Sequence, residues 1–199
     1  MTSRSNILMV FAALTVGATA CSDDPTEPED ALTEEEAISL LNAYRGLVAT
    51  ENPEFIEETP TGGIIGCPLG GTAEVNLLGG GDEEFAGDTV RLTLDVSINP
   101  MNCRIAAAGA EYVVTGDPRV REQFRMQVVG VFESIEVTGS TVGALAWEHG
   151  DRSGSCEMDL ALTAEPNFMD PVNPVDATLT GMLCGHQVTI DGAALPFVD

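Results

Sequence analysis

The sequence predicts a mainly β protein, an antiparallel meander of about eight strands curled into a barrel or half-barrel, with one N-terminal helix. Three observations support this prediction. Apolar residues recur with a period of two from residue 64 onward, turn residues separate the alternating stretches, and only one earlier stretch has a helical period. A two-layer β-sandwich is the alternative arrangement of the same strands.

The helix is expected over residues 33–50. Thr33 and Glu36 have the spacing of a capping box, and acidic residues in the first turn suit the helix dipole. Arg45 flanks the apolar face, and its long aliphatic stem predicts that its guanidinium extends into water. The residues that recur at three- and four-residue steps, and so predict a face packed on the core, are Ala37, Leu40, Leu41, Tyr44, Leu47 and Val48.

The clearest strand covers residues 89–98, where Val90, Leu92 and Leu94 alternate with polar side chains. Such alternation is typical of an antiparallel strand with one buried face. Residues 117–129 also fit a helix, and we prefer a strand there. The remaining predicted strands are 71–78, 111–116, 124–132, 134–147, 155–164, 177–184 and 186–191.

Four cysteines in the β region predict two disulfides. The midpoint between Cys67 and Cys103 falls in the turn-rich stretch GGGDEEFAGD, and the midpoint between Cys156 and Cys184 falls in EPNFMDPVNP. Paired antiparallel strands are symmetric about their loop, so each pair is expected to face across its own long hairpin. The predicted bonds are therefore Cys67–Cys103 and Cys156–Cys184.

Cys184 does not fit the alternation of its own strand. It is out of phase with Leu179 and Leu183. A β-bulge at Gly181 is therefore expected, because one extra residue would move Cys184 to the face of Leu179.

The first 20 residues have the features of an export signal. Arg4 supplies a basic start, and residues 7–20 carry no charge. A helix of this length rises about 21 Å, which is too short for a hydrocarbon core of about 30 Å. Small residues, Ala18-Thr19-Ala20, then precede a possible cut. Ordinary signal-peptidase cleavage would leave Cys21 as a plain thiol.

Residues 18–21 also resemble the lipobox of bacterial lipoproteins, with Ala18 at the position where that pattern more often has leucine. The resemblance covers about the first 21 residues only. It implies that Cys21 is acylated and becomes the first residue of the mature chain, which leaves an even set of cysteines for disulfides. It also implies a cell-envelope protein held to the membrane through the Cys21 lipid. Ser22 after the cysteine favours the outer membrane.

The predicted mature chain has a simple organisation. Residues 21–32 form an acidic tether with few apolar side chains. The helix at 33–50 and the strands at 51–199 are expected to form one domain, since their length suffices for a single core.

The net charge of the chain argues against several classes of binding partner. The chain has no lysine, and loss of Arg4 with the signal leaves seven arginines against 32 acidic residues, a net charge of −25. Nucleic acids and anionic lipid surfaces are therefore not expected partners. Without lysine, the chain also lacks the residue used for Schiff bases and for phosphate binding in a P-loop.

The sequence gives only weak signals for a metal-binding site. Cys156, Cys184, His149 and His186 lack the paired spacing of a zinc site, and disulfides are the favoured use of these cysteines. His186 is expected on a strand surface and His149 at a turn facing water. No cofactor and no metal site is predicted.

Two further motifs contain residue types that occur in catalytic or ion-binding sites. DRSGSC, residues 151–156, lies beside His149 without a nucleophile elbow, and neighbours in one turn rarely form a triad. The acids Asp82, Glu83, Glu84 and Asp88 lack the order of a calcium loop, so a hairpin loop is favoured.

The sequence therefore favours a non-enzymatic lipoprotein with an interaction or structural role. Two alternatives remain: a carrier that holds an apolar ligand in its curled sheet, and, less favoured, a hydrolase. A carrier needs an open apolar cavity of about 300 Å³ or more.

Changing Cys21 to Ser is expected to abolish labelling by a palmitate analogue and to release the protein from membranes. A lipoprotein carries more than one acyl chain, and each buried methylene contributes about 0.8 kcal/mol, so the anchor is stable only when the cysteine is modified. Metabolic labelling and membrane fractionation measure both effects. Membrane retention of the Cys21→Ser protein would contradict the prediction.

Overall fold

The computed structural model describes residues 31–49, 62–80, 84–130, 134–166 and 175–192. Cys21, the signal and most of the tether lie outside these residues. The described chain contains one helix and eleven strands. They are α1 (Glu34–Ala49), β1 (Gly62–Gly66), β2 (Thr72–Gly80), β3 (Glu84–Ala86), β4 (Thr89–Met101), β5 (Cys103–Ala107), β6 (Ala110–Gly116), β7 (Val120–Val129), β8 (Ser134–His149), β9 (Arg152–Pro166), β10 (Val175–Leu183) and β11 (His186–Asp191).

All strands belong to one antiparallel sheet. Its main path is β1-β2-β4-β7-β8-β9-β10-β11, which is the order along the chain, while β3 pairs with β4. The β5–β6 hairpin joins through β6 to the end of β8, and β7 pairs with the beginning of β8. The predicted meander and its single helix are confirmed, and residues 117–129 contribute a strand rather than a helix.

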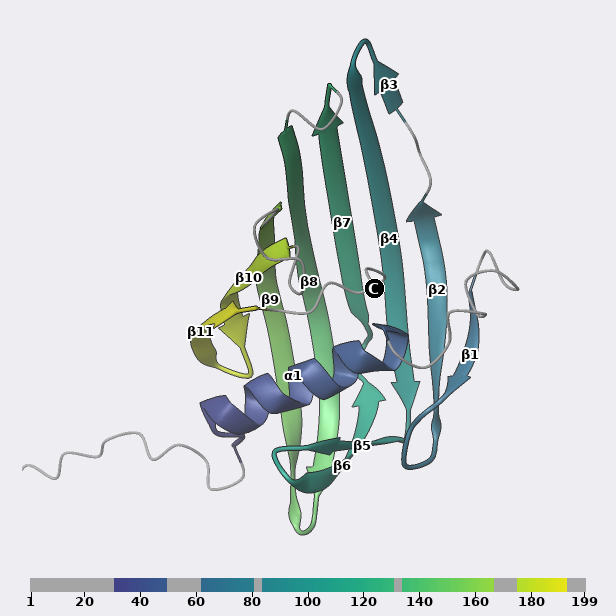
Figure 1. The fold of residues 1–199 in the computed structure, drawn as a ribbon. Coiled ribbons are helices and arrows are strands. Elements are labelled where there is room, and N and C mark those ends of the chain that lie inside the picture. Colours follow the sequence, from purple (N-terminus) through teal and green to yellow (C-terminus); the bar gives the residue numbers. More distant parts are fainter. Residues whose placement is uncertain (1–30, 50–61, 81–83, 131–133, 167–174, 193–199) are drawn as a thin grey trace, which may run out of the picture.

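The sheet is curved and open, with α1 lying across its concave face (Figure 1). It does not close into a barrel, and the described strands form one layer rather than a sandwich. The curvature lets strands from both sides of the sheet reach the same short helix.

The core lies between α1 and the half of the concave face nearest the β5–β6 hairpin. The helix begins with the predicted capping box, in which the Thr33 N–H donates to Glu36 at 2.9 Å and the Glu36 N–H donates to the Thr33 hydroxyl at 3.2 Å. The predicted inward residues Ala37, Leu40, Leu41, Tyr44 and Leu47 are buried, whereas the side chain of Val48 lies outside the described part. Leu32, placed in the tether from sequence, is also buried in this core.

The structure contains both predicted disulfides, Cys67–Cys103 and Cys156–Cys184. Thr72 pairs with Met101 at the open end of the β2–β4 hairpin, and the first disulfide lies just beyond that pair. Met158 pairs with Leu183 at the open end of the β9–β10 hairpin, next to the second. Each bond therefore joins the two arms of a long hairpin, as the loop-centred midpoints predicted.

The predicted bulge at Gly181 was wrong. The β9–β10 register runs without a shift from Val175 to Leu183, and Cys184 follows the strand. Cys184 has a φ of 50° in the turn, and its N–H donates to the Glu157 carbonyl at 2.8 Å. This left-handed residue turns the chain, so the cysteine reaches Cys156 without a change of register.

Serine at both Cys156 and Cys184 is expected to lower the free energy of unfolding by about 3–4 kcal/mol, because that bond closes a loop of about 30 residues. Urea denaturation measures the loss. Peptide mapping should still find the Cys67–Cys103 bond intact. An unchanged urea midpoint would show that the bond adds nothing to stability.

Candidate functional site

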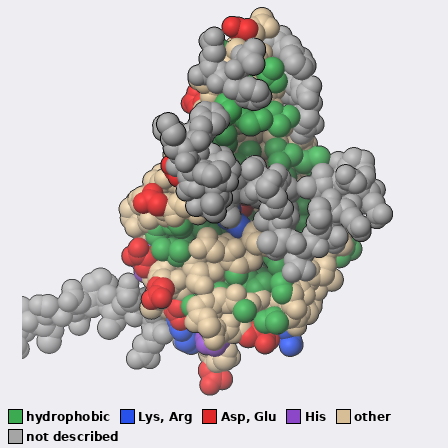
Figure 2. Space-filling view, viewed as in Figure 1, with side chains coloured by type: hydrophobic (Ala, Val, Ile, Leu, Met, Phe, Trp, Pro, Cys, Tyr) green, Lys and Arg blue, Asp and Glu red, His purple; other side chains and the backbone are tan. Residues whose placement is uncertain are grey.

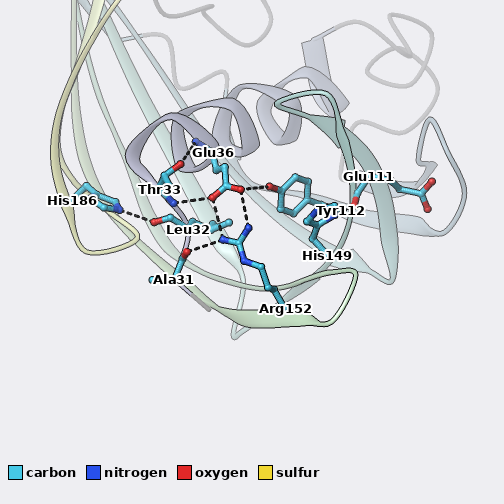
Figure 3. Close-up of polar contacts among 9 residues, drawn as sticks. All are labelled: Ala31, Leu32, Thr33, Glu36, Glu111, Tyr112, His149, Arg152 and His186. Atoms are coloured by element: carbon cyan, nitrogen blue, oxygen red, sulfur yellow. Dashed lines mark hydrogen bonds and ion pairs between the residues drawn. The ribbon is translucent and has the colours of Figure 1, made fainter. Parts of the chain in front are cut away.

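A cluster of polar side chains surrounds the beginning of α1 (Figure 3). We call Glu36, Tyr112, Arg152 and His186 the N-terminal cluster. Glu36 lies at its centre, where Arg152 donates to both carboxylate oxygens at 2.9 and 3.1 Å and the Tyr112 hydroxyl donates at 3.4 Å. Strands from distant parts of the sequence thereby hold the first turn of the helix.

Arg152 links this cluster to the chain that enters the domain. Its guanidinium donates to the Ala31 carbonyl at 2.7 Å and lies 5.6 Å from the centre of the Trp147 ring. The hydrogen bonds from Arg152, and then the Thr33 N–H, lower the pKa of Glu36 from 4.5 to about 2. Glu36 is therefore a charged structural anchor at neutral pH and not a proton donor.

Both histidines bind backbone carbonyls. His186 Nε2 lies 2.8 Å from the Leu32 oxygen, and His149 Nδ1 lies 2.9 Å from the Glu111 oxygen. The His149 ring also packs on Tyr112, with centroids 4.9 Å apart. His186 lies on the predicted strand, and both histidine side chains are partly exposed. Their contacts with the carbonyls of other elements were not predicted from the sequence.

The structure does not assemble the weak chemical motifs. Cys156 and Cys184 are bonded to each other and are not free to bind zinc. Among the described residues, no group of three or more His, Cys, Asp or Glu side chains is placed to hold a metal ion. Glu84 begins the short strand β3, while Asp82 and Glu83 lie outside the described residues.

A second charged group is buried beneath the other end of α1. Arg45 Nε lies 3.3 Å from Glu122 Oε1, and the two side chains are only 3% and 2% exposed. The prediction that Arg45 extends into water was wrong, because its side chain points to the sheet and meets a carboxylate of β7. Burial raises the pKa of Glu122, and the charge of Arg45 opposes that shift.

Glu122 was not predicted from the sequence as a site residue. Its position gave a signal, because it is in phase with Val120, Phe124 and Val128. These residues share the concave face of β7, so a glutamate among them had to be buried or paired.

The rest of the concave face is apolar and lies beyond the helix. Going along β7 from Glu122, three rows of neighbouring side chains cross β4, β7 and β8. We call these rows the apolar tract, and all its residues are half-buried. The rows are Leu94–Phe124–Gly139, Leu92–Met126–Val137 and Val90–Val128–Ile135.

The apolar tract differs sharply from the region under the helix. On the same face, Val96, Ile98 and Leu145 are at most 2% exposed. Figure 2 shows hydrophobic side chains at the surface over the part of the sheet that α1 does not cross. One continuous apolar face is thus divided into a helix-covered core and a half-buried tract.

Two hollows lined by described residues lie away from the apolar tract. One, of about 240 Å³, lies on the convex face among Thr93, Gln123, Arg125, Thr138 and Ser140. Another lies on the outer side of the first turns of α1. Buried side chains pack between α1 and the sheet, and the apolar tract beyond them is the candidate binding surface.

Comparisons with known proteins identify no relative. No protein-family model, no curated protein and no solved structure matches this chain. Within the described residues, no helix has the length and apolar character needed to cross a membrane.

Changing Glu36 to Gln is expected to destabilise the protein by about 1–2 kcal/mol at neutral pH, the order of a charge-assisted hydrogen bond. A carboxylate with a lowered pKa stabilises the fold above its ordinary pKa of 4.5, and that contribution is lost as the pH falls toward about 2. Thermal melts from pH 7 to pH 2 should therefore show the two proteins converging at low pH.

Glu35→Gln is the matched control, because it removes the same charge from an exposed position in the same helical turn. It should melt like the native protein at every pH. A constant difference between Glu36→Gln and native protein across the whole range would contradict the role given to the Glu36 charge.

Proposed function

We propose that this protein is a lipid-anchored, non-enzymatic component of the cell envelope that binds an apolar molecule on its apolar tract. The observation that carries the binding role is the half-buried apolar tract on β4, β7 and β8. A continuous patch of apolar side chains that remain partly accessible is characteristic of a binding surface. The proposed binding is on the face of the sheet, and it does not require the open cavity of about 300 Å³ expected of a carrier.

The cellular location predicted from the sequence supports the same function. The lipobox-like residues before Cys21 and the acidic tether predict a domain tied to a membrane yet held away from its surface. The excess of acidic residues opposes direct contact with anionic headgroups. Such a domain is placed to take up or present a lipid near the membrane without lying on it.

A non-enzymatic role agrees with how the described polar side chains are used. Both histidines bind backbone carbonyls, and the four cysteines form disulfides. Glu36 is held in its charged form by Arg152. These groups have structural partners, which argues against the hydrolase alternative.

Docking of a protein partner on the convex face is the second candidate. Val142 and Met182 are 47% and 43% exposed there, on either side of Asp159 in neighbouring strands. Arg121 continues the same row on β7. This row faces away from the apolar tract, so substitutions on the two faces separate the two functions.

Changing Met126 to Gln is expected to weaken binding of the apolar fluorescent probe N-phenyl-1-naphthylamine several-fold. Glutamine has a similar size but places a polar amide in the middle row of the tract. Fluorescence titration of the purified protein measures its affinity for the probe.

Met182→Gln is the matched control, since it makes the same change on the exposed convex face. It should leave probe binding unchanged. Failure of the native protein to bind the probe, or equal weakening by both substitutions, would refute the proposed binding surface.

A further inference from the structure

The buried Arg45–Glu122 pair lacks the hydrogen bonds that usually accompany buried charges. Within the described part of the chain, no protein group hydrogen-bonds to the guanidinium nitrogens of Arg45 or to either carboxylate oxygen of Glu122. The two side chains approach each other at 3.3 Å between Nε and Oε1. A buried ion pair is favourable only when its remaining donors and acceptors are also satisfied. This site therefore calls for further polar partners.

The pair lies at one end of the apolar tract. Glu122 precedes Phe124, Met126 and Val128 on the concave face of β7, so it forms the next row of the same surface. Its neighbours in that row are Val96 on β4 and the buried hydroxyl residue Thr141 on β8. The concave face thus runs from a buried polar end directly into three apolar rows.

The dimensions suit one lipid chain. The four-residue step from Phe124 to Val128 spans about 14 Å at the rise of a β-strand. One leaflet of a membrane, half of a hydrocarbon core of about 30 Å, has nearly the same thickness. An acyl chain laid along β7 from Phe124 would therefore cover the tract, with its head beside Glu122.

We infer that the apolar tract binds a single-chain lipid with a neutral polar head, and that Arg45 and Glu122 bind the head. This inference rests on the binding role proposed above and specifies its ligand. A monoacylglycerol has the required chemistry: its ester carbonyl accepts from the Arg45 guanidinium, and its hydroxyl groups donate to the Glu122 carboxylate.

The charge of the site selects a neutral head over an anionic one. Arg45 and Glu122 already neutralise each other, so a fatty-acid carboxylate would add an uncompensated negative charge at a site that excludes water. The strongly acidic chain adds to that repulsion. The protein should therefore distinguish monoolein from oleate, although their acyl chains are identical.

The test is displacement of N-phenyl-1-naphthylamine from the purified full-length protein by monoolein and by oleate at pH 7. Native protein should bind monoolein at least tenfold more tightly than oleate. The double variant Arg45→Met with Glu122→Met should lose this preference, while probe binding stays within about twofold of native. Replacing both charges together avoids a lone buried charge, and such replacements are often neutral for stability.

Arg104→Met with Glu111→Met is the matched control, because it removes an ion pair of the same composition whose side chains are more than half exposed. It should keep the native preference for monoolein. The inference would be overturned if native protein bound oleate as tightly as monoolein. It would also be overturned if the Arg45→Met, Glu122→Met protein, the core double variant, kept the preference for monoolein.

The two proposals fail in different ways. Probe binding without any preference for monoolein leaves the proposed binding surface standing and removes only the ligand class. Absence of probe binding removes both. If the core double variant does not fold, mass spectrometry of lipid extracted from the native protein decides: a neutral single-chain lipid supports the inference, and a fatty acid alone overturns it.

Discussion

A single helix covers only part of one face of the sheet, and this partial coverage sets the size of the core. The 16 residues of α1 give a rod about 24 Å long and about 10 Å wide, whereas a 16-residue strand such as β8 extends about 54 Å. The helix lies across the strands and therefore covers only part of their length (Figure 1). Under the helix the core is fully buried, and beyond it the same apolar face is only half-buried.

The two ends of α1 are held by different chemistry. At its beginning, Glu36 and Arg152 form a partly exposed ion pair in which both groups also have backbone partners. At its other end, Arg45 meets Glu122 in a buried site where no described group of the protein hydrogen-bonds to either charge. The first arrangement is a stable anchor for the helix. The second lies where the covered core meets the apolar tract, so the polar end of the proposed lipid site is also part of the helix–sheet contact.

The entry of the chain into the domain is secured at the same place as the start of the helix. Arg152 and His186 bind the carbonyls of Ala31 and Leu32, and the Leu32 side chain is buried in the core. Tension on an N-terminal membrane tether would therefore act on this cluster before it reached the helix. The Cys156–Cys184 bond joins β9, the strand of Arg152, to the turn that precedes His186. A covalent link therefore connects the two segments that hold the entering chain.

The strand pattern, the helix start at Thr33 and the pairing of the four β-region cysteines could be predicted from the amino-acid sequence. These features depend on local signals: a period of two, a capping box that spans four residues, and loops centred between cysteines. Tertiary structure decided that the sheet stays open, that Arg45 is buried, and that both histidines bind distant carbonyls. Periodicity reports which residues share a face, but not what covers that face. The partner of Arg45 is 77 residues away in the chain, and only the curvature of the sheet beneath α1 brings Glu122 to it.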